Sequence, residues 1–298
     1  MKVAVPGSHG FIGSALIPTL KAKGHQIIRL VRSEPERASD TIYWNPASDS
    51  IDMASIEGVE AVIHLAGESI FGRWTSAKKK EILDSRVEGT RRLAQTLTQL
   101  KRPPAVLVCA SAIGIYGDRG ADWLEEDSLS GSGFLADVCR QWETAAQPAV
   151  QHGIRVVSIR TGIVLSPKGG ALAQMLPPFR MGVGGRVGSG NQYMSWIALD
   201  DLIEAYHHAL STTEISGAVN AVAPHPVTNL EFTGTLGKVL SRPAIIPLPA
   251  FAVRAVFGEM GVELLLSSAR VRPARLLNSS FNYRCSDLET ALRQLLGR

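Results

Sequence analysis

The chain has 298 residues, of which 45% are hydrophobic and 19% charged, and its formal net charge is +4. This composition is ordinary for a globular protein, suits one large α/β domain or two lobes, and excludes an intrinsically disordered chain. Apart from Lys78–Lys80 the basic residues are scattered and no nucleic-acid motif accompanies them, so nucleic-acid binding is not expected.

The first predicted element is a short buried strand, Val3–Val5, followed by a glycine motif and an amphipathic helix, Phe11–Lys23. Glycines spaced as G-x-x-G-x-x-G allow a tight turn, close approach of the backbone to a pyrophosphate and close packing of helix on strand. Free N–H groups at the helix N-terminus favour bound phosphate. A glycine-rich turn in some other βα unit is the alternative. We predict a dinucleotide site whose first residues are Gly7, Ser8, Gly10, Phe11, Ile12 and Gly13.

Strand and helix patterns then alternate through the first half of the chain. This alternation indicates a parallel sheet with helices on both faces, and we predict an α/β, doubly wound parallel-sheet Rossmann fold. The further predicted elements are strands at Gln26–Val31, Ala61–Leu65, Ala105–Ala110 and Arg155–Ile159, and long helices at Lys78–Leu100 and Phe134–His152.

The second half of the chain is richer in glycine and proline and less regular. Trp196–Leu210 and Ala218–Ala221 are expected to return to the nucleotide-binding part. The sequence therefore predicts a Rossmann domain over 1–165 with about 196–223, and a smaller C-terminal substrate lobe over 166–195 and 224–298.

Seven further stretches form a pattern with the glycine motif: His64-Leu-Ala-Gly-Glu68, Arg73-Trp74, Ser85–Thr90, Ser111–Gly117, Trp142-Glu143, Arg160–Leu165 and Ser195-Trp-Ile197. With these stretches the chain resembles the extended short-chain dehydrogenase/reductases, and more narrowly their atypical sugar-nucleotide epimerase-like branch. The resemblance covers nearly the whole chain and is much more specific than the glycine motif.

The resemblance implies further cofactor-binding residues at strand ends, which are Leu65, Ala66, Gly67, Thr161 and Gly162. It also implies a homodimer built from the two long helices, to which Ile82, Leu93, Leu97 and Val138 would contribute, although these residues would equally pack on the sheet. Plant and cyanobacterial members of the branch include proteins tied to chloroplast or cell division.

The end of the second strand indicates which cofactor binds. An NAD-selective fold places an acidic residue there to bind the ribose 2′-hydroxyl. This chain instead has Arg32 and Ser33, with Arg37 nearby, and a guanidinium suits a 2′-phosphate. Arg32 as a plain exposed strand-end residue is the alternative. We therefore predict NADP(H).

The acid/base pair of the family is missing. The family uses Tyr-x-x-x-Lys, but Leu135 and Cys139 stand at these positions when the helix is registered on Glu143. Cys139 reads as a small buried hydrophobe, since no base is in evidence to form its thiolate. The catalytic hydroxyl survives as Ser111. Tyr116 is the candidate replacement acid, and the alternative is a packing residue whose hydroxyl caps its loop.

Candidate substrate residues follow the strand ends, where loops face the bound cofactor. An arginine for phosphate and aromatic faces for a sugar or base would suit a nucleotide-sugar; they would equally suit a loop that packs two lobes together. These residues are Glu68, Arg73, Trp74, Gln192, Tyr193, Ser195 and Trp196.

Two functions remain open. The first is an NADP(H)-dependent reductase or epimerase acting on a nucleotide-sugar or another small carbonyl or alcohol. The second is a catalytically silent NADP(H)-binding regulatory protein, with cell or plastid division as a role. The intact Ser111 favours the first, and the absent Tyr-Lys pair favours the second.

The remaining expectations concern metal, membrane and compartment. The three cysteines are widely spaced, which argues against a disulfide framework or zinc site and for a reducing compartment, and no metal is expected. The longest apolar stretch, 244–253, contains two prolines and is too short to span a bilayer. A strand that starts at Lys2 leaves no room for a signal peptide, so a cytoplasmic protein without membrane insertion is expected.

Overall fold

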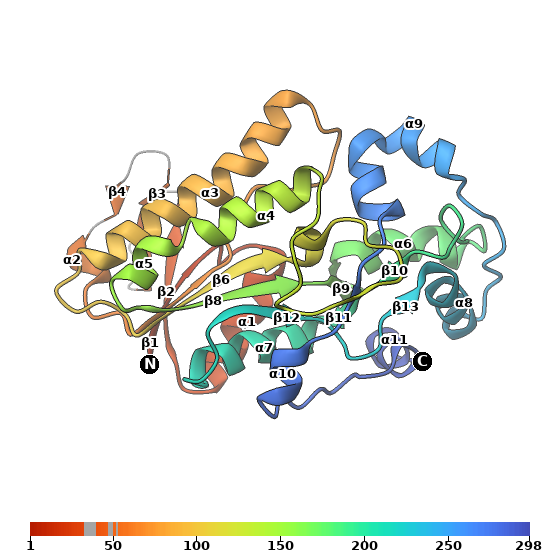
Figure 1. Cartoon of the computed structure of the whole chain (residues 1–298). Helices are drawn as coiled ribbons and strands as arrows, with labels where there is room; N and C mark the ends of the chain where they lie inside the picture. The colour runs from red at the N-terminus through yellow and green to blue at the C-terminus, as the bar shows by residue number, and fades with distance from the viewer. Residues whose placement is uncertain (33–39, 47–49, 52) are drawn as a thin grey trace.

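The computed structural model describes residues 1–32, 40–46, 50–51 and 53–298 (Figure 1). The predicted cofactor residue Ser33, and Arg37 with it, lie outside the described residues. A large sheet runs through the molecule in the order β12-β8-β6-β5-β1-β2-β3-β4, parallel except for the pairing of β3 with β4. Its strands are β1 (Lys2–Pro6), β2 (Gln26–Val31), β3 (Thr41–Asn45), β4 (Ser50–Ile51), β5 (Ala61–His64), β6 (Val106–Ala112), β8 (Arg155–Thr161) and β12 (Gly217–Ala221).

Helices cover both faces of this sheet, as the doubly wound prediction requires (Figure 1). On one face α1 (Phe11–Ala22) and α7 (Leu199–Ser211) pack against the strands, and on the other lie α3 (Ser76–Thr98), α4 (Phe134–Thr144) and α5 (Gln147–Gln151). Because both faces are covered, the central strands are apolar on both sides. The predicted α/β Rossmann fold is confirmed.

The predicted helix over 134–152 is wrong in one respect, because the structure has two helices there. The chain leaves α4 at Ala145 and starts again at Gln147, with Pro148 in the first turn of α5. Proline has no N–H for the bond that a continuous helix would need, whereas it is well tolerated in a first turn.

The four apolar residues expected to form a dimer face are buried within the single chain. Ile82, Leu93 and Leu97 of α3 are fully buried, and Val138 of α4 is 2% exposed. These side chains therefore pack inside the molecule, which was the alternative, and offer no surface to a second copy.

A second hydrophobic cluster lies beyond the carboxyl ends of the main strands. It is centred on the buried rings of Trp196 and Phe232 and is formed largely by α6 (Gly170–Arg180), α8 (Asn229–Leu240) and α11 (Leu288–Leu296). The division of the chain into the two predicted lobes stays a prediction. Short strands pair here as β9 (Ile163–Ser166) with β11 (Trp196–Ala198), β10 (Tyr193–Met194) with β13 (Val227–Thr228), and β7 (Trp123–Leu124) with β14 (Arg270–Val271).

Five short or peripheral helices complete the described structure. They are α2 (Met53–Ile56), the 3₁₀-helix η1 (Ile113–Tyr116), α9 (Ala250–Gly261), the π-helix η2 (Val262–Leu266) and α10 (Ala274–Asn278). None of the helices in the described ranges combines the length and the apolar character that crossing a bilayer requires.

Candidate active site

The glycine motif forms a tight loop between β1 and α1. Gly7 has a φ of +82°, and a Cβ there would lie 2.6 Å from the backbone nitrogen of Ala66. A Cβ on Gly13 would lie 2.3 Å from the carbonyl oxygen of Gly7. Only glycine therefore allows this loop to pack against the end of β5 and the start of α1.

The N-terminus of α1 is suited to an anion. Gly10 is its N-cap residue, no side chain caps the helix, and its first turn holds no acidic residue. Backbone N–H groups in the first turn of a helix have no intrahelical partner and favour negative charge. The residues present therefore fit the pyrophosphate of a dinucleotide.

Basic side chains lie at the neighbouring strand β2. Arg32, directly after β2, is exposed, and Arg29 within β2 has a buried Nε that makes no hydrogen bond to the described residues and lies 3.9 Å from Oδ2 of Asp40. Arg29 also borders a hollow of about 200 Å³ that includes Ser8 and His9 of the glycine loop. This donor set fits an additional phosphate better than a plain ribose. The sequence argument missed Arg29, although it lies only three residues before Arg32.

The loop after β5 is fastened to α3. Ser85 Oγ accepts a hydrogen bond from the backbone nitrogen of Glu68 at 2.9 Å, and Arg86 Nη1 donates to the Glu68 carbonyl oxygen at 2.9 Å. The Glu68 carboxylate is 2.6 Å from Lys78 Nζ, and this hydrogen bond lowers the pKa of Glu68. The predicted substrate residue Glu68 is thus already paired, while Arg73 is exposed.

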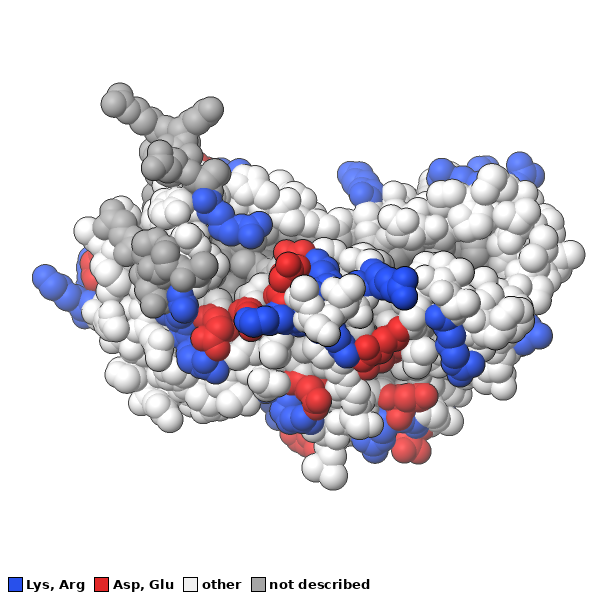
Figure 2. Space-filling model, turned by 90° about the horizontal axis from the view of Figure 1, so that it is seen from above, with Lys and Arg blue, Asp and Glu red and all other residues white. Residues whose placement is uncertain are grey.

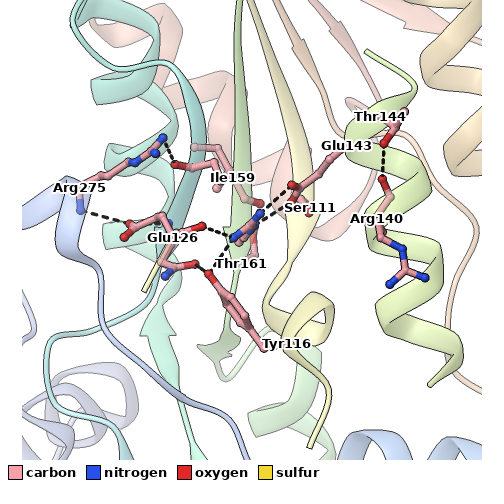
Figure 3. Close-up of polar contacts among 12 residues, drawn as sticks. Ser111, Tyr116, Glu126, Arg140, Glu143, Thr144, Ile159, Thr161 and Arg275 are labelled. Carbon is pink, nitrogen blue, oxygen red and sulfur yellow. Dashed lines mark hydrogen bonds and ion pairs between the residues drawn. The ribbon is translucent and has the colours of Figure 1, made fainter. Parts of the chain in front are cut away.

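At the carboxyl end of β6, Ser111 belongs to a polar network (Figure 3). Its hydroxyl donates to Oε1 of Glu143 on α4 at 2.7 Å. Arg160, its register neighbour on β8, holds both oxygens of the same carboxylate, with Nε and Nη2 each at 2.9 Å. A bidentate arginine fixes both the charge and the orientation of a carboxylate. The network therefore aims a carboxylate oxygen at the Ser111 hydroxyl.

Tyr116 lies in the same network but in its interior. The ring is fully buried, and the hydroxyl lies 2.8 Å from Asn220 Oδ1 and 3.0 Å from the Glu125 carbonyl oxygen. Arg160 Nη1 donates to this hydroxyl at 2.9 Å. Burial raises the pKa of Tyr116 above its ordinary value, which opposes a role as base.

The positions of the missing Tyr-Lys pair are filled by apolar contacts. A Cβ on Gly114 of η1 would lie 3.3 Å from Leu135 Cβ and 4.0 Å from Cys139 Sγ. Burial raises the pKa of the Cys139 thiol to about 12, so the thiol is protonated at neutral pH. Neither residue can replace a general acid or base of the family.

A cation that the sequence argument missed lies beside Cys139. The Arg86 guanidinium is 5.1 Å from the centroid of the Trp142 ring, and its charge acts on the Cys139 thiol. Its Cζ would lie 3.4 Å from a Cβ on Gly67, at the cofactor edge of the sheet. The sequence pointed to Arg86 only through the stretch Ser85–Thr90, which supported the family resemblance but was given no functional role.

The predicted substrate residues of the second half are used by the chain itself. Gln192 Nε2 donates to the carbonyl oxygens of Val187 and Leu265, each at 3.0 Å. Ser195 Oγ donates to the Ala269 carbonyl oxygen at 2.7 Å, and the fully buried Trp196 donates to that of His225 at 3.2 Å. We therefore assign these three side chains to packing, the alternative reading of the sequence.

Two further predicted residues also serve packing. Trp74 Nε1 donates to the Ile70 carbonyl oxygen at 2.8 Å, and its ring packs edge-on against Phe134. A Cβ on Gly162 would lie 2.5 Å from the Ser195 carbonyl oxygen, so glycine lets the end of β8, with Thr161, pack against the chain before β11.

A strand–glycine loop–helix unit at β1, with a serine at the carboxyl end of β6 two strands away, defines a dinucleotide-binding protein of the short-chain dehydrogenase/reductase type. The family model described as "NAD dependent epimerase/dehydratase family" matches residues 3–221, and the model "Domain of unknown function (DUF1731)" matches residues 248–295. The chain belongs to the NAD-dependent epimerase/dehydratase family.

Relatives match along the whole chain. "Epimerase family protein MT2273" of Mycobacterium tuberculosis is 43% identical over 291 residues, which covers 97% of this chain and 96% of that protein. The crystal structure of human epimerase family protein SDR39U1 (isoform 2) with NADPH superposes with a TM-score of 0.91 at 36% identity and covers all of both chains. A nucleoside-diphosphate sugar epimerase from Corynebacterium glutamicum has a TM-score of 0.81 at 38% identity; the match covers all of this chain and 58% of that one.

Proposed function

We propose that this protein is an NADP(H)-dependent oxidoreductase or epimerase of the short-chain type that acts on a nucleotide-sugar or another small carbonyl or alcohol. The observation that carries the proposal is the hydrogen bond from Ser111 to an arginine-held Glu143 at the carboxyl end of β6. The carboxylate gives the Ser111 hydroxyl a fixed proton acceptor at hydrogen-bond distance. The solved human relative, which contains NADPH, supports the choice of cofactor.

The cofactor would be held by the glycine loop and the end of β2. The backbone of Gly7–Gly13 and the N-terminus of α1 would bind the pyrophosphate, and Arg32 with Arg29 would bind the 2′-phosphate. When bound, NADP(H) supplies or accepts a hydride.

Ser111 and Glu143 would move the proton. In the direction of alcohol oxidation, the proton of the substrate hydroxyl passes to Ser111 Oγ while the proton of Ser111 passes to Glu143 Oε1, 2.7 Å away. Carbonyl reduction reverses both transfers. The role suggested by the sequence for Tyr116 changes: its burial and its three hydrogen-bond partners favour a structural residue.

Arg86 would supply the fixed positive charge that the family's lysine provides. An arginine keeps its proton at neutral pH, so it can stabilise negative charge developing on the substrate oxygen but cannot donate a proton. In this scheme Arg86 stabilises the charge on the substrate oxygen, and Ser111 transfers the proton.

The test is a turnover assay with NADPH and NADP⁺ across a panel of nucleotide-sugars and simple carbonyl compounds, with Ser111→Ala and Cys139→Ala as variants. We expect turnover that Ser111→Ala abolishes and Cys139→Ala preserves. Binding of NADPH without turnover of any compound would instead support the silent regulatory protein, for which a role in division is a prediction from the sequence resemblance.

A further inference from the structure

Two segments far from the glycine loop expose a run of large apolar side chains. Their exposed fractions are 69% for Met181, 80% for Ile245, 73% for Phe251 and 70% for Val256. Val183, Ile246 and Leu248 are also exposed. Soluble domains seldom leave so many large apolar groups together in water without a partner. We call the exposed surface of 180–186 and 242–256 the apolar surface.

The apolar surface is held together by backbone hydrogen bonds. The nitrogen of Leu248 donates to the carbonyl oxygen of Arg186 at 2.8 Å, and the nitrogen of Gly188 donates to the carbonyl oxygen of Leu248 at 2.8 Å. A Cβ on Gly185 would lie 1.9 Å from the Ile246 carbonyl oxygen, so the two segments are in direct contact. These contacts hold 185–188 against 246–248, the part of the apolar surface next to α9.

The charges on this surface have one sign. Arg180, Arg186, Arg242 and Arg254 are exposed, and none pairs with a carboxylate within the described part of the chain. The sequence has no Asp or Glu from 144 to 199 or from 232 to 258. At the right-hand end of the face in Figure 2, where α9 lies, the charged groups are blue, whereas blue and red are mixed towards the middle.

We propose that the apolar surface docks the protein on an anionic phospholipid membrane. Phenylalanine and aliphatic side chains enter the boundary between headgroups and acyl chains, and the surrounding arginines contact lipid phosphates. The protein is not inserted across the bilayer. This proposal does not depend on the proposed enzymatic function.

A second copy of the chain fits this surface less well. A two-fold symmetric contact would place the surface against itself. The contact would bring the exposed arginines of both copies into one interface with no carboxylate of this surface to pair with, and buried like charges are costly. A membrane rich in acidic headgroups would pair with the arginines and would also take up the apolar side chains.

Docking here would place the membrane near the candidate active site. At its far end α9 carries Glu259, whose Oε1 is 2.6 Å from Lys79 Nζ on α3. The next residues bring Glu263 onto the N-terminus of α4, the helix that carries Glu143. The surface and the site are thus linked through α9 and η2.

The test is co-sedimentation of the full-length protein with phosphatidylcholine vesicles, with and without phosphatidylglycerol. The apolar variant is Phe251→Ser with Ile245→Ser. The charge variant is Arg180→Ser with Arg254→Ser, and the side chains of these two arginines make no hydrogen bond to any described residue. Leu129→Ser and Lys101→Glu are matched controls at exposed positions elsewhere. Circular dichroism checks that each variant folds.

We expect binding only to the vesicles with phosphatidylglycerol. About 1 kcal/mol per arginine near the surface corresponds to roughly fivefold, so the charge variant, which lacks two arginines, should bind about twenty-five-fold more weakly. The apolar variant should also lose binding, and both controls should keep it. No binding to anionic vesicles, or equal binding by all folded variants, would overturn the proposal. Loss of self-association in the apolar variant, without vesicle binding by the wild type, would overturn it in favour of a protein partner.

Discussion

At the scale of single residues, two hydroxyl groups near the sheet edge have different environments. Ser111 donates one hydrogen bond to a carboxylate, and no described group donates to its hydroxyl, whereas the buried Tyr116 hydroxyl has the acceptors Asn220 Oδ1 and the Glu125 carbonyl oxygen and receives a hydrogen bond from Arg160. Proton transfer requires the first arrangement, and structural support the second.

Tyr116→Phe should therefore cost stability and not turnover. Removing the hydroxyl leaves Asn220 Oδ1 without its buried donor, which typically costs about 1–3 kcal/mol, while Arg160 Nη1 keeps the Glu126 carbonyl oxygen as an acceptor. Urea unfolding should show this loss, while the NADPH oxidation rate per folded molecule stays within about twofold. A folded Tyr116→Phe protein without turnover would return the acid/base role to this tyrosine.

Arg32 should decide between the two nicotinamide cofactors. We expect Arg32→Ala to weaken NADPH binding about tenfold or more, a change of about 1.4 kcal/mol, because a guanidinium partner of the 2′-phosphate is lost. NADH has no such phosphate and serves as the matched ligand. Fluorescence titration measures both; equal affinities for the two cofactors in the wild type would contradict the assignment.

His64 should make the fold sensitive to acid. It is fully buried on β5, neither ring nitrogen has a described hydrogen-bond partner, and burial lowers its pKa to about 4. The unfolded chain, with a pKa near 6.5, then binds more protons, so stability is complete above pH 6.5 and falls as the pH drops towards 4, by up to about 3 kcal/mol. His64→Leu should lose less stability between pH 7 and pH 5 in urea titrations. Parallel losses in both proteins would refute this.

At the scale of elements, α4 depends on a distant part of the chain. Its N-cap residue is Gly133, which has no side chain, and Glu263 of η2 instead accepts hydrogen bonds from the backbone nitrogens of Phe134 and Leu135, each at 2.8 Å. This carboxylate satisfies two free donors and lies at the positive end of the helix dipole. It also connects η2 to the helix that carries Glu143.

Glu263→Ala should destabilise the protein by about 1–2 kcal/mol, the usual effect of removing an N-cap acceptor. Glu263→Gln keeps one acceptor oxygen and should recover part of the loss. Urea unfolding provides the measurement, with Glu81→Ala, at an exposed position on α3, as the control. An unchanged midpoint for Glu263→Ala would show that the cap contributes nothing.

The sequence predicted elements well where the signal was local. The apolar strands, the glycine loop and the β2 boundaries follow from neighbouring residues, whereas the break before Pro148, the strand β3 and the helices α6, α8 and α11 were not predicted. The cap from Glu263 to α4 joins positions about 130 residues apart, and a pattern of neighbouring residues does not predict such a contact.

At the scale of the whole molecule, the fold brings together site residues that lie far apart in the sequence. Ser111, Glu143 and Arg160 come from β6, α4 and β8, and the last two lay in recognised motifs without a role. The substrate prediction was weaker because Gln192, Ser195 and Trp196 donate hydrogen bonds to backbone carbonyl oxygens of the chain itself. Burial cannot be read from residue type alone.

The measurement that tests the central claim most directly is the rate of NADPH oxidation by Glu143→Gln beside Tyr116→Phe, with the substrate that the wild type turns over. Glutamine keeps the shape of the side chain but removes the carboxylate that accepts the Ser111 proton. We predict a loss on the order of 10²–10⁴ for Glu143→Gln, the usual effect of losing a positioned acid or base, and little change for Tyr116→Phe. A Glu143→Gln enzyme as fast as the wild type would contradict the account.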